Sequence, residues 1–194
     1  MKLSHIVSGL LAVLTVMSSM VFAKEKLMRL EASPLPSFAL EDAWGEPFQN
    51  KNFNNKWSVV TIGFVSCPDV CPFILTNLRV VSNQIAQISR DNIEVVFVSV
   101  DPTRDKDILA DYVDHFGHNV TGITGEETEL QKLAKGIGAY YELEKPDSSG
   151  QYNVRHSAFA VVVSPEGEMV ARLSPPLPAL ETAKFIVNLM RSQS

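Results

Sequence analysis

The sequence predicts an α/β fold in which helices flank a central mixed sheet. Two apolar stretches, WSVVTIGFV at 57–65 and IEVVFVSV at 93–100, have the composition of strands that are buried on both faces. A helical pattern follows each stretch, and this alternation is typical of parallel strands. A late β-hairpin at 158–173 adds antiparallel strands, because a Pro-Glu-Gly turn separates two apolar runs.

Length and charge narrow the class of protein. The chain has 194 residues, of which 45% are hydrophobic and 20% charged, as expected for one globular domain. The net charge of −5 argues against nucleic acid or an anionic membrane surface as the partner. We therefore expect no nucleic-acid binding.

The first segment, residues 1–23, predicts a secretory signal peptide. Lys2 supplies the positive start, an apolar run extends from Ile6 to Val21, and Val-Phe-Ala precedes a possible cut before Lys24. An uncleaved anchor is the alternative, although the run is short and rich in Ser and Thr for a membrane span. Both alternatives predict a periplasmic domain, either free or tethered to the inner membrane.

The rest of the chain begins with an N-terminal extension. Residues 24–36 are polar and end in Pro-Leu-Pro, which predicts a linker to a single domain at 37–194. Short strands are expected at 37–40 and around 47–48, joined by a Trp-Gly turn.

Helices are predicted after both buried strands. The first extends to Arg90, with Pro72 in its first turn, where no backbone donor is needed. The second starts at Asp101, whose expected role is to fix the helix start and the loop, and ends at Gly117. The remaining predicted elements are a strand or loop at 119–124, a helix at 126–137, a strand at 140–143, a flexible loop at 145–153, the hairpin strands 158–163 and 168–173, and a last helix at 180–189.

Both cysteines of the chain lie in one motif, SCPDVCPF at 66–73. The motif connects the first buried strand to its helix, with Cys67 in the loop and Cys71 at the helix start. A helix N-terminus lowers a thiol pKa, so the position predicts thiolates that suit either disulfide exchange or a soft metal. A purely structural disulfide would close only a small loop and add little stability. Asp69 is expected to cap the helix.

The histidines offer one further candidate ligand. His5 lies in the predicted signal peptide, and His115 and His118 are expected on the surface at the end of a helix. His156 stands between the polar loop and the strand at 158–163, where it could project toward a neighbouring strand–helix loop. A structural role for His156 is the alternative.

Three features together resemble the SCO/SenC family of copper-binding proteins: GFVSCPDVCPF, VSVDPTRD and a downstream histidine before an apolar strand. The resemblance extends from about Leu35 to Met190. It implies a thioredoxin-like fold, an exported or tethered location, and delivery of copper to the CuA centre of an exported cytochrome c oxidase subunit. By motif match, Cys67 and Cys71 take the thiolate positions and His156 the imidazole position.

The chemistry of these groups agrees with copper, as Cu(I), Cu(II) or both. Two thiolates and an imidazole form a small soft site, whereas structural zinc prefers four protein ligands. A catalytic zinc site remains open by ligand count. Copper and a Cys67–Cys71 disulfide compete for the same sulfur atoms, so loading requires a thiol reductant protein as a second partner. A metallochaperone of this kind would not be an enzyme.

The main alternative is an enzyme, a thiol–disulfide oxidoreductase in which Cys67 attacks and Cys71 resolves. Such enzymes usually have C-x-x-C spacing and a proline where this chain has His156, and both differences favour copper. Arg155 departs from the family pattern, in which an aspartate commonly precedes the histidine, and a cation there is expected to weaken copper binding. A peroxide-reducing enzyme and a binding module with regulatory cysteines are weaker alternatives.

Overall fold

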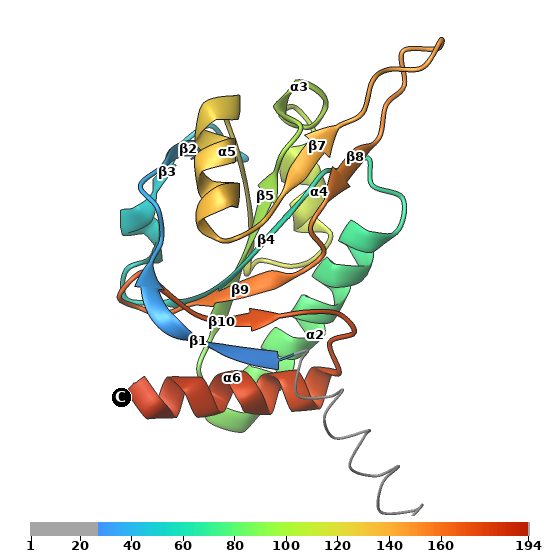
Figure 1. The fold of residues 1–194 in the computed structure, drawn as a ribbon. Helices are drawn as coiled ribbons and strands as arrows, with labels where there is room; N and C mark the ends of the chain where they lie inside the picture. Colours follow the sequence, from blue (N-terminus) through green and yellow to red (C-terminus); the bar gives the residue numbers. More distant parts are fainter. Residues whose placement is uncertain (1–26, 194) are drawn as a thin grey trace, which may run out of the picture.

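The computed structural model describes residues 27–193, which form a mixed eight-stranded sheet with helices on both of its faces (Figure 1). The strands are β1 (Leu27–Pro34), β2 (Ala39–Asp42), β3 (Pro47–Gln49), β4 (Trp57–Gly63), β5 (Ile93–Ser99), β6 (Val120–Thr124), β9 (Ala160–Val163) and β10 (Glu168–Leu173). The helices are η1 (Asn50–Phe53), α2 (Val70–Ser89), α3 (Pro102–Asp105), α4 (Leu109–Asp114), α5 (Glu127–Gly136) and α6 (Ala179–Gln193). A separate two-stranded sheet contains β7 (Tyr141–Leu143) and β8 (Val154–His156).

The centre of the large sheet is parallel, as the two apolar stretches predict. The spatial order of the strands is β1-β10-β9-β4-β5-β6-β2-β3. β4 pairs in parallel with β5, and β5 with β6, whereas the hairpin formed by β9 and β10 joins β4 in the antiparallel direction. The predicted mixed sheet and late hairpin are thus confirmed. Because β4 and β5 are buried along most of their length, the segments that leave their carboxyl ends start from a rigid base.

The predicted linker at 24–36 is wrong for most of its length. Residues 27–34 form β1, which pairs antiparallel with β10 at the edge of the sheet. Its side chains are mostly exposed, so its polar composition is compatible with a strand that is held by backbone hydrogen bonds to one neighbour. The predicted signal peptide at 1–23 lies outside the described residues. Within residues 27–193, no helix combines the length and apolar character that a membrane crossing requires.

The single helix predicted from Asp101 to Gly117 is also wrong, because the chain forms two short helices, α3 and α4. The break between them allows the fully buried Asp105 carboxylate to accept hydrogen bonds from the core, while Leu109 and Val113 on α4 are buried too. A buried carboxylate needs such partners, and a continuous amphipathic pattern does not reveal this need.

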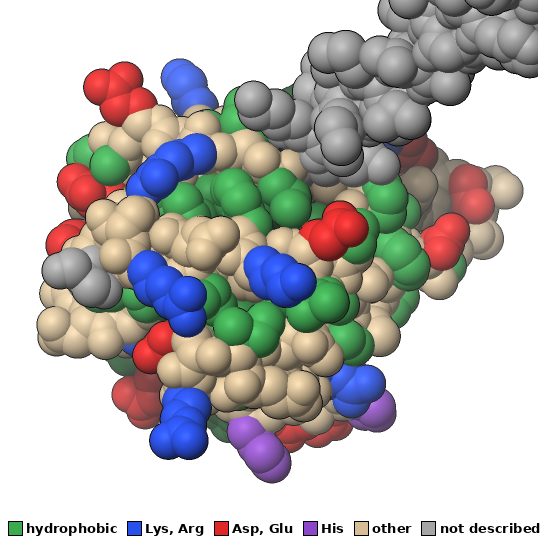
Figure 2. Space-filling model, turned by 90° about the horizontal axis from the view of Figure 1, so that it is seen from below, with side chains coloured by type: hydrophobic (Ala, Val, Ile, Leu, Met, Phe, Trp, Pro, Cys, Tyr) green, Lys and Arg blue, Asp and Glu red, His purple; other side chains and the backbone are tan. Residues whose placement is uncertain are grey.

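The helix α6 packs against α2 on one side of the molecule. Figure 2 shows this side, on which Lys and Arg side chains surround patches of hydrophobic side chains. The start of α2 lies away from α6, on the side of the β7–β8 hairpin (Figure 1). The candidate ligands are therefore at the end of α2 that points away from α6.

Candidate metal centre

The two cysteines lie where the strand-to-helix connection was predicted. β4 ends at Gly63 and α2 begins at Val70, so Cys67 is in the connecting loop and Cys71 is in the first turn of the helix. The backbone N–H of Cys71 donates a hydrogen bond to Cys67 Sγ across 3.4 Å. The helix N-terminus thus binds a sulfur atom. Asp69 occupies the cap position, but its side chain makes no capping hydrogen bond, so the predicted capping role is wrong.

A glycine that the sequence analysis did not single out creates space for one sulfur. A Cβ atom added to Gly63 would lie 2.6 Å from Cys71 Sγ and 2.7 Å from the Phe97 ring. Both distances are shorter than van der Waals contact, so only glycine allows Cys71 to pack against the end of β4. The signal in the sequence is a lone glycine inside an otherwise bulky apolar strand.

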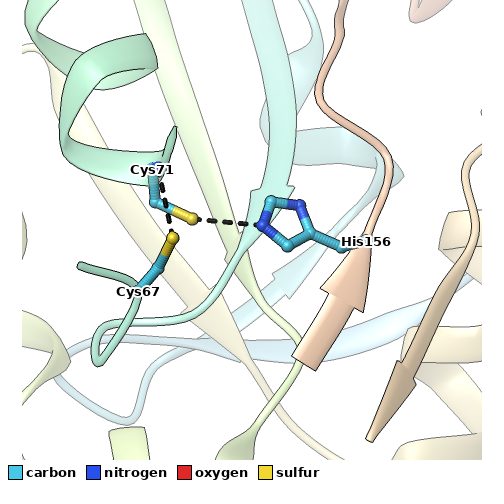
Figure 3. Close-up of side chains that lie close together, drawn as sticks. All are labelled: Cys67, Cys71 and His156. Carbon is cyan, nitrogen blue, oxygen red and sulfur yellow. Dashed lines mark hydrogen bonds between the residues drawn. The ribbon is translucent and has the colours of Figure 1, made fainter. Parts of the chain in front are cut away.

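The histidine approaches the cysteines from the β7–β8 hairpin (Figure 3). His156 is the last residue of β8 and is paired with Tyr141 of β7. Its Nδ1 lies 3.0 Å from the carbonyl oxygen of Ser157, and its Nε2 lies 3.4 Å from Cys71 Sγ. A carbonyl only accepts, so Nδ1 carries the proton and the Nε2 lone pair faces the sulfur. The Phe64 ring packs edge-on against the imidazole at 5.9 Å between centroids.

The three predicted ligands meet in one place. The Sγ atoms of Cys67 and Cys71 and one ring nitrogen of His156 all lie within 4.8 Å of one another. Both cysteines are free thiols. Within residues 27–193, this is the one such cluster of His, Cys, Asp and Glu side chains with metal-binding spacing. His115 and His118 are exposed, as predicted, and take no part in it.

Burial sets the protonation of the two inner groups. Desolvation raises the pKa of the Cys71 thiol well above its usual value, and the neighbouring Cys67 side chain adds to the rise. Desolvation lowers the pKa of His156, because burial disfavours the charged imidazolium. The expectation that the helix N-terminus would lower the Cys71 pKa is wrong, because burial outweighs the helix dipole here. Without a bound cation, the site therefore holds a neutral thiol and a neutral imidazole.

The cation beside the histidine is directed away from the site. Successive residues of a strand point to opposite faces, so Arg155 and His156 lie on different sides of β8. The Arg155 guanidinium pairs with Glu142 at 2.9 Å and with Glu144 at 3.3 Å, and its side chain is 63% exposed. Two carboxylates and solvent therefore compensate its charge, which removes the reason to expect weak copper binding.

An open pocket gives access to Cys67. It has a volume of about 280 Å³, and its lining includes Pro68, Val70 and His156 as well as the cysteine. Val70 and Phe73 on the first turns of α2 are 40% and 53% exposed. A partner can therefore reach the half-buried Cys67 past the exposed Val70 side chain, whereas Cys71 is buried.

Comparison with known proteins assigns the family. The family model described as SCO1/SenC matches residues 28–191. The chain belongs to the SCO1/SenC family. Among SCO1/SenC relatives, the mitochondrial protein SCO1 of Saccharomyces cerevisiae is 33% identical over 138 residues, which are 70% of this chain and 47% of that protein. This chain thus spans about half the length of that curated relative.

Solved SCO1/SenC structures share the fold. A crystal structure of yeast Sco1 with copper bound has a TM-score of 0.77 and 29% identity, covering 82% of this chain and 90% of that one. A crystal structure of copper-bound ScoI of Arabidopsis thaliana has a TM-score of 0.76 and 29% identity, covering 81% of this chain and 99% of that chain. The fold is therefore thioredoxin-like, as the family resemblance implied.

Proposed function

We propose that this SCO1/SenC protein binds copper through Cys67, Cys71 and His156 and works as a metallochaperone in cytochrome c oxidase assembly. The observation that carries the proposal is the meeting of two sulfur atoms and one imidazole nitrogen within 4.8 Å, from segments far apart in the chain. The copper-bound structures of yeast and Arabidopsis relatives support the choice of metal.

The donor set suits Cu(I). Thiolates are soft ligands that select Cu(I), and the neutral imidazole presents a free Nε2 lone pair. Structural zinc prefers a fourth protein ligand, and the cluster contains three residues. Cu(I) binding replaces the proton of the buried Cys71 thiol, so copper uptake releases protons. The positive copper ion also compensates the negative charge of the Cys71 thiolate, which burial disfavours when no cation is bound.

Delivery follows from the unequal exposure of the ligands. Cys67 borders an open pocket, and an acceptor thiolate that enters there can bind the copper before Cys71 and His156 release it. We propose the CuA-containing subunit of cytochrome c oxidase as the acceptor and the periplasm, with or without a membrane tether, as the location. A thiol reductant protein would keep the two cysteines reduced.

The test is a Cu(I) titration of the reduced protein against a competing chelator. His156→Ala should lower the affinity at least about tenfold, or about 1.4 kcal/mol, because one of three ligands is lost. A Cys67→Ser, Cys71→Ser double variant should lose the site altogether. If the parent binds Cu(I) no more tightly than this double variant, copper binding by these residues is wrong.

A thiol–disulfide oxidoreductase is the second candidate. The observation that favours it is a half-exposed Cys67 beside a second free thiol, which is the arrangement of an attacking and a resolving cysteine. Disulfide reductase turnover of the same sample separates the two functions. The metallochaperone proposal expects almost no turnover; rapid turnover that His156→Ala leaves unchanged would support the oxidoreductase.

A further inference from the structure

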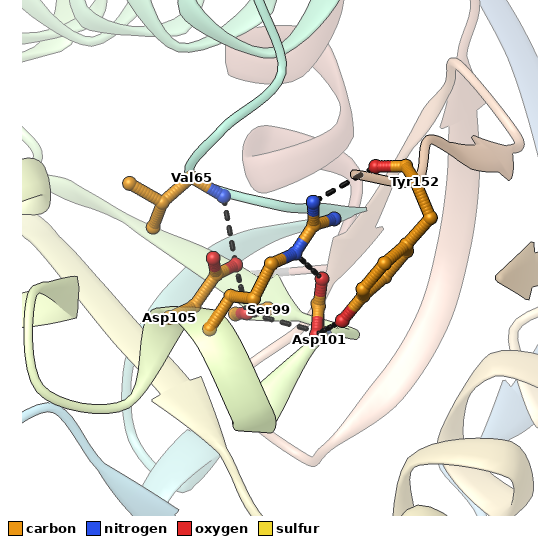
Figure 4. Close-up of polar contacts among 6 residues, drawn as sticks. Val65, Ser99, Asp101, Asp105 and Tyr152 are labelled. Atoms are coloured by element: carbon orange, nitrogen blue, oxygen red, sulfur yellow. Dashed lines mark hydrogen bonds and ion pairs between the residues drawn. The ribbon is translucent and has the colours of Figure 1, made fainter. Parts of the chain in front are cut away.

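The segment after β5, from Asp101 to Asp105, touches both halves of the candidate site (Figure 4). One half is the loop that leaves β4 and leads to Cys67. The other is the hairpin that ends in His156. The sequence favoured Asp101 as a residue that fixes the helix start and the loop, with a position near the site as the alternative. In the structure, Asp101 and Asp105 are both fully buried.

The contact with the hairpin consists of several linked interactions. The Asp101 carboxylate accepts a hydrogen bond from the Tyr152 hydroxyl at 2.9 Å and another from Arg104 Nε at 2.5 Å. Arg104 Nη1 donates in turn to the Tyr152 carbonyl oxygen at 2.8 Å, and the guanidinium carbon lies 3.7 Å from the Tyr152 ring centroid. Tyr152 is thus held by its hydroxyl, its ring and its backbone, four residues before His156.

The contact with the cysteine loop comes from the other end of the segment. Asp105 accepts hydrogen bonds from the backbone N–H of Val65 at 2.7 Å and from the Ser99 hydroxyl at 2.6 Å. Arg104 also lies over the Phe64 ring, at 5.7 Å from its centroid, and that ring packs against the His156 imidazole. One short segment therefore sets the positions of both sides relative to each other.

The hairpin needs such support. Among residues 27–193, β7 and β8 pair only with each other, over three residues each, and form a sheet separate from the eight-stranded one. An isolated two-stranded hairpin is marginally stable in water. The charged partners of Arg155 lie within the same hairpin, so they do not attach it to the rest of the domain. The strands themselves are anchored by the buried Tyr141 and Val154, and the Tyr141 hydroxyl donates to Glu127 of α5 at 2.9 Å. Asp101 and Arg104 attach the segment between the two strands, at Tyr152.

We propose that Asp101, Arg104 and Tyr152 form a clamp that positions the imidazole of His156 against the two sulfur atoms. The clamp residues do not bind the metal; they are positioning residues. Since Cu(I) tolerates two sulfur ligands, the position of the histidine decides whether the copper gains its third ligand. This inference rests on the proposed copper binding by Cys67, Cys71 and His156.

Two conservative variants test the clamp by a double-mutant cycle. Tyr152→Phe removes the hydrogen bond from the hydroxyl to Asp101 but keeps the ring. Arg104→Lys keeps the positive charge, but a lysine cannot contact Asp101 and the Tyr152 carbonyl with two separate nitrogen atoms as the guanidinium does. Each should weaken Cu(I) binding about tenfold in the parent, as outer-shell variants of metal sites do, and should have no effect in a His156→Ala background. Arg155→Gln is the matched control on the other face of β8 and should leave the affinity unchanged.

A second readout needs no copper. Hydrogen exchange of the reduced, metal-free protein should become faster in residues 141–156 of both clamp variants and stay unchanged in the Arg155→Gln control. Equal loss of affinity with and without His156, or unchanged affinity and exchange in both variants, would overturn the clamp. If the parent itself fails to bind Cu(I), the proposed function fails, and the exchange data still report on the clamp.

Discussion

At the scale of single residues, the two cysteines are not equivalent. Cys71 is buried beside Gly63 and the imidazole, and burial raises its thiol pKa. Cys67 is half-buried and borders the open pocket. Because thiol reactivity depends on both thiolate fraction and access, this asymmetry assigns Cys67 as the sulfur that meets a reagent or a partner first.

Alkylation of the reduced, metal-free protein tests this asymmetry. At mildly alkaline pH, iodoacetamide should modify Cys67 at least about tenfold faster than Cys71, since the buried thiol stays protonated. Peptide mass spectrometry at several times gives the two rates. Cu(I)-loaded protein serves as the control, in which both residues should be protected. Faster modification of Cys71 would contradict the assigned roles.

The ligands were predictable from the sequence, whereas their environment was not. The paired cysteines and the histidine belong to a recognisable pattern, and local propensity places the cysteines on the connection between a strand and a helix. The raised pKa of Cys71 depends on burial, to which residues distant in sequence contribute, such as His156, 85 positions away. The contacts of Asp101 with Tyr152 likewise join positions 51 residues apart, and no local signal reveals them.

At the scale of elements, the end of β4 determines how closely α2 approaches the sheet. Its last residue, Gly63, leaves only the space that Cys71 Sγ and the Phe97 ring occupy. Any side chain there must displace the sulfur or the ring. Gly63 therefore determines both the packing of α2 on the sheet and the position of Cys71 Sγ in the site.

The Gly63→Ala variant tests this dependence. We expect a loss of about 1–3 kcal/mol in the free energy of unfolding, because an extra methyl overpacks a filled core. Cu(I) affinity should fall as well, because Cys71 Sγ has to move. Ser58→Ala is the control, since Ser58 lies buried on the same strand and its hydroxyl has no hydrogen-bond partner in the described part of the chain. A Gly63→Ala protein with parental stability and parental Cu(I) affinity would disprove the close-approach argument.

The elements that sequence patterns found are those with a continuous apolar signal. β4, β5 and the β9–β10 hairpin are largely buried, and α2 buries one regularly spaced apolar face, so these elements stand out in the sequence. β1 is an exposed edge strand whose existence depends on pairing with β10, far along the chain. A pattern that is read locally does not contain this pairing, so the segment resembled a linker.

At the scale of the whole molecule, the fold brings distant segments to one edge. Parallel pairing of β4 and β5 places the loop before α2 next to the segment that starts at Asp101. The β7–β8 hairpin completes the site from residues that follow α5. A copper ion bound there would join Cys67 and Cys71 to His156, which lies far along the chain. Copper binding should therefore also stabilise the folded domain.

X-ray absorption at the copper edge tests the central claim most directly, because it reports the atoms bound to the metal. The Cu(I)-loaded parent should show two sulfur scatterers and one imidazole nitrogen, and His156→Ala should keep the sulfur atoms and lose the nitrogen. A parent spectrum without imidazole scattering, or one that His156→Ala leaves unchanged, would contradict a copper site formed by Cys67, Cys71 and His156.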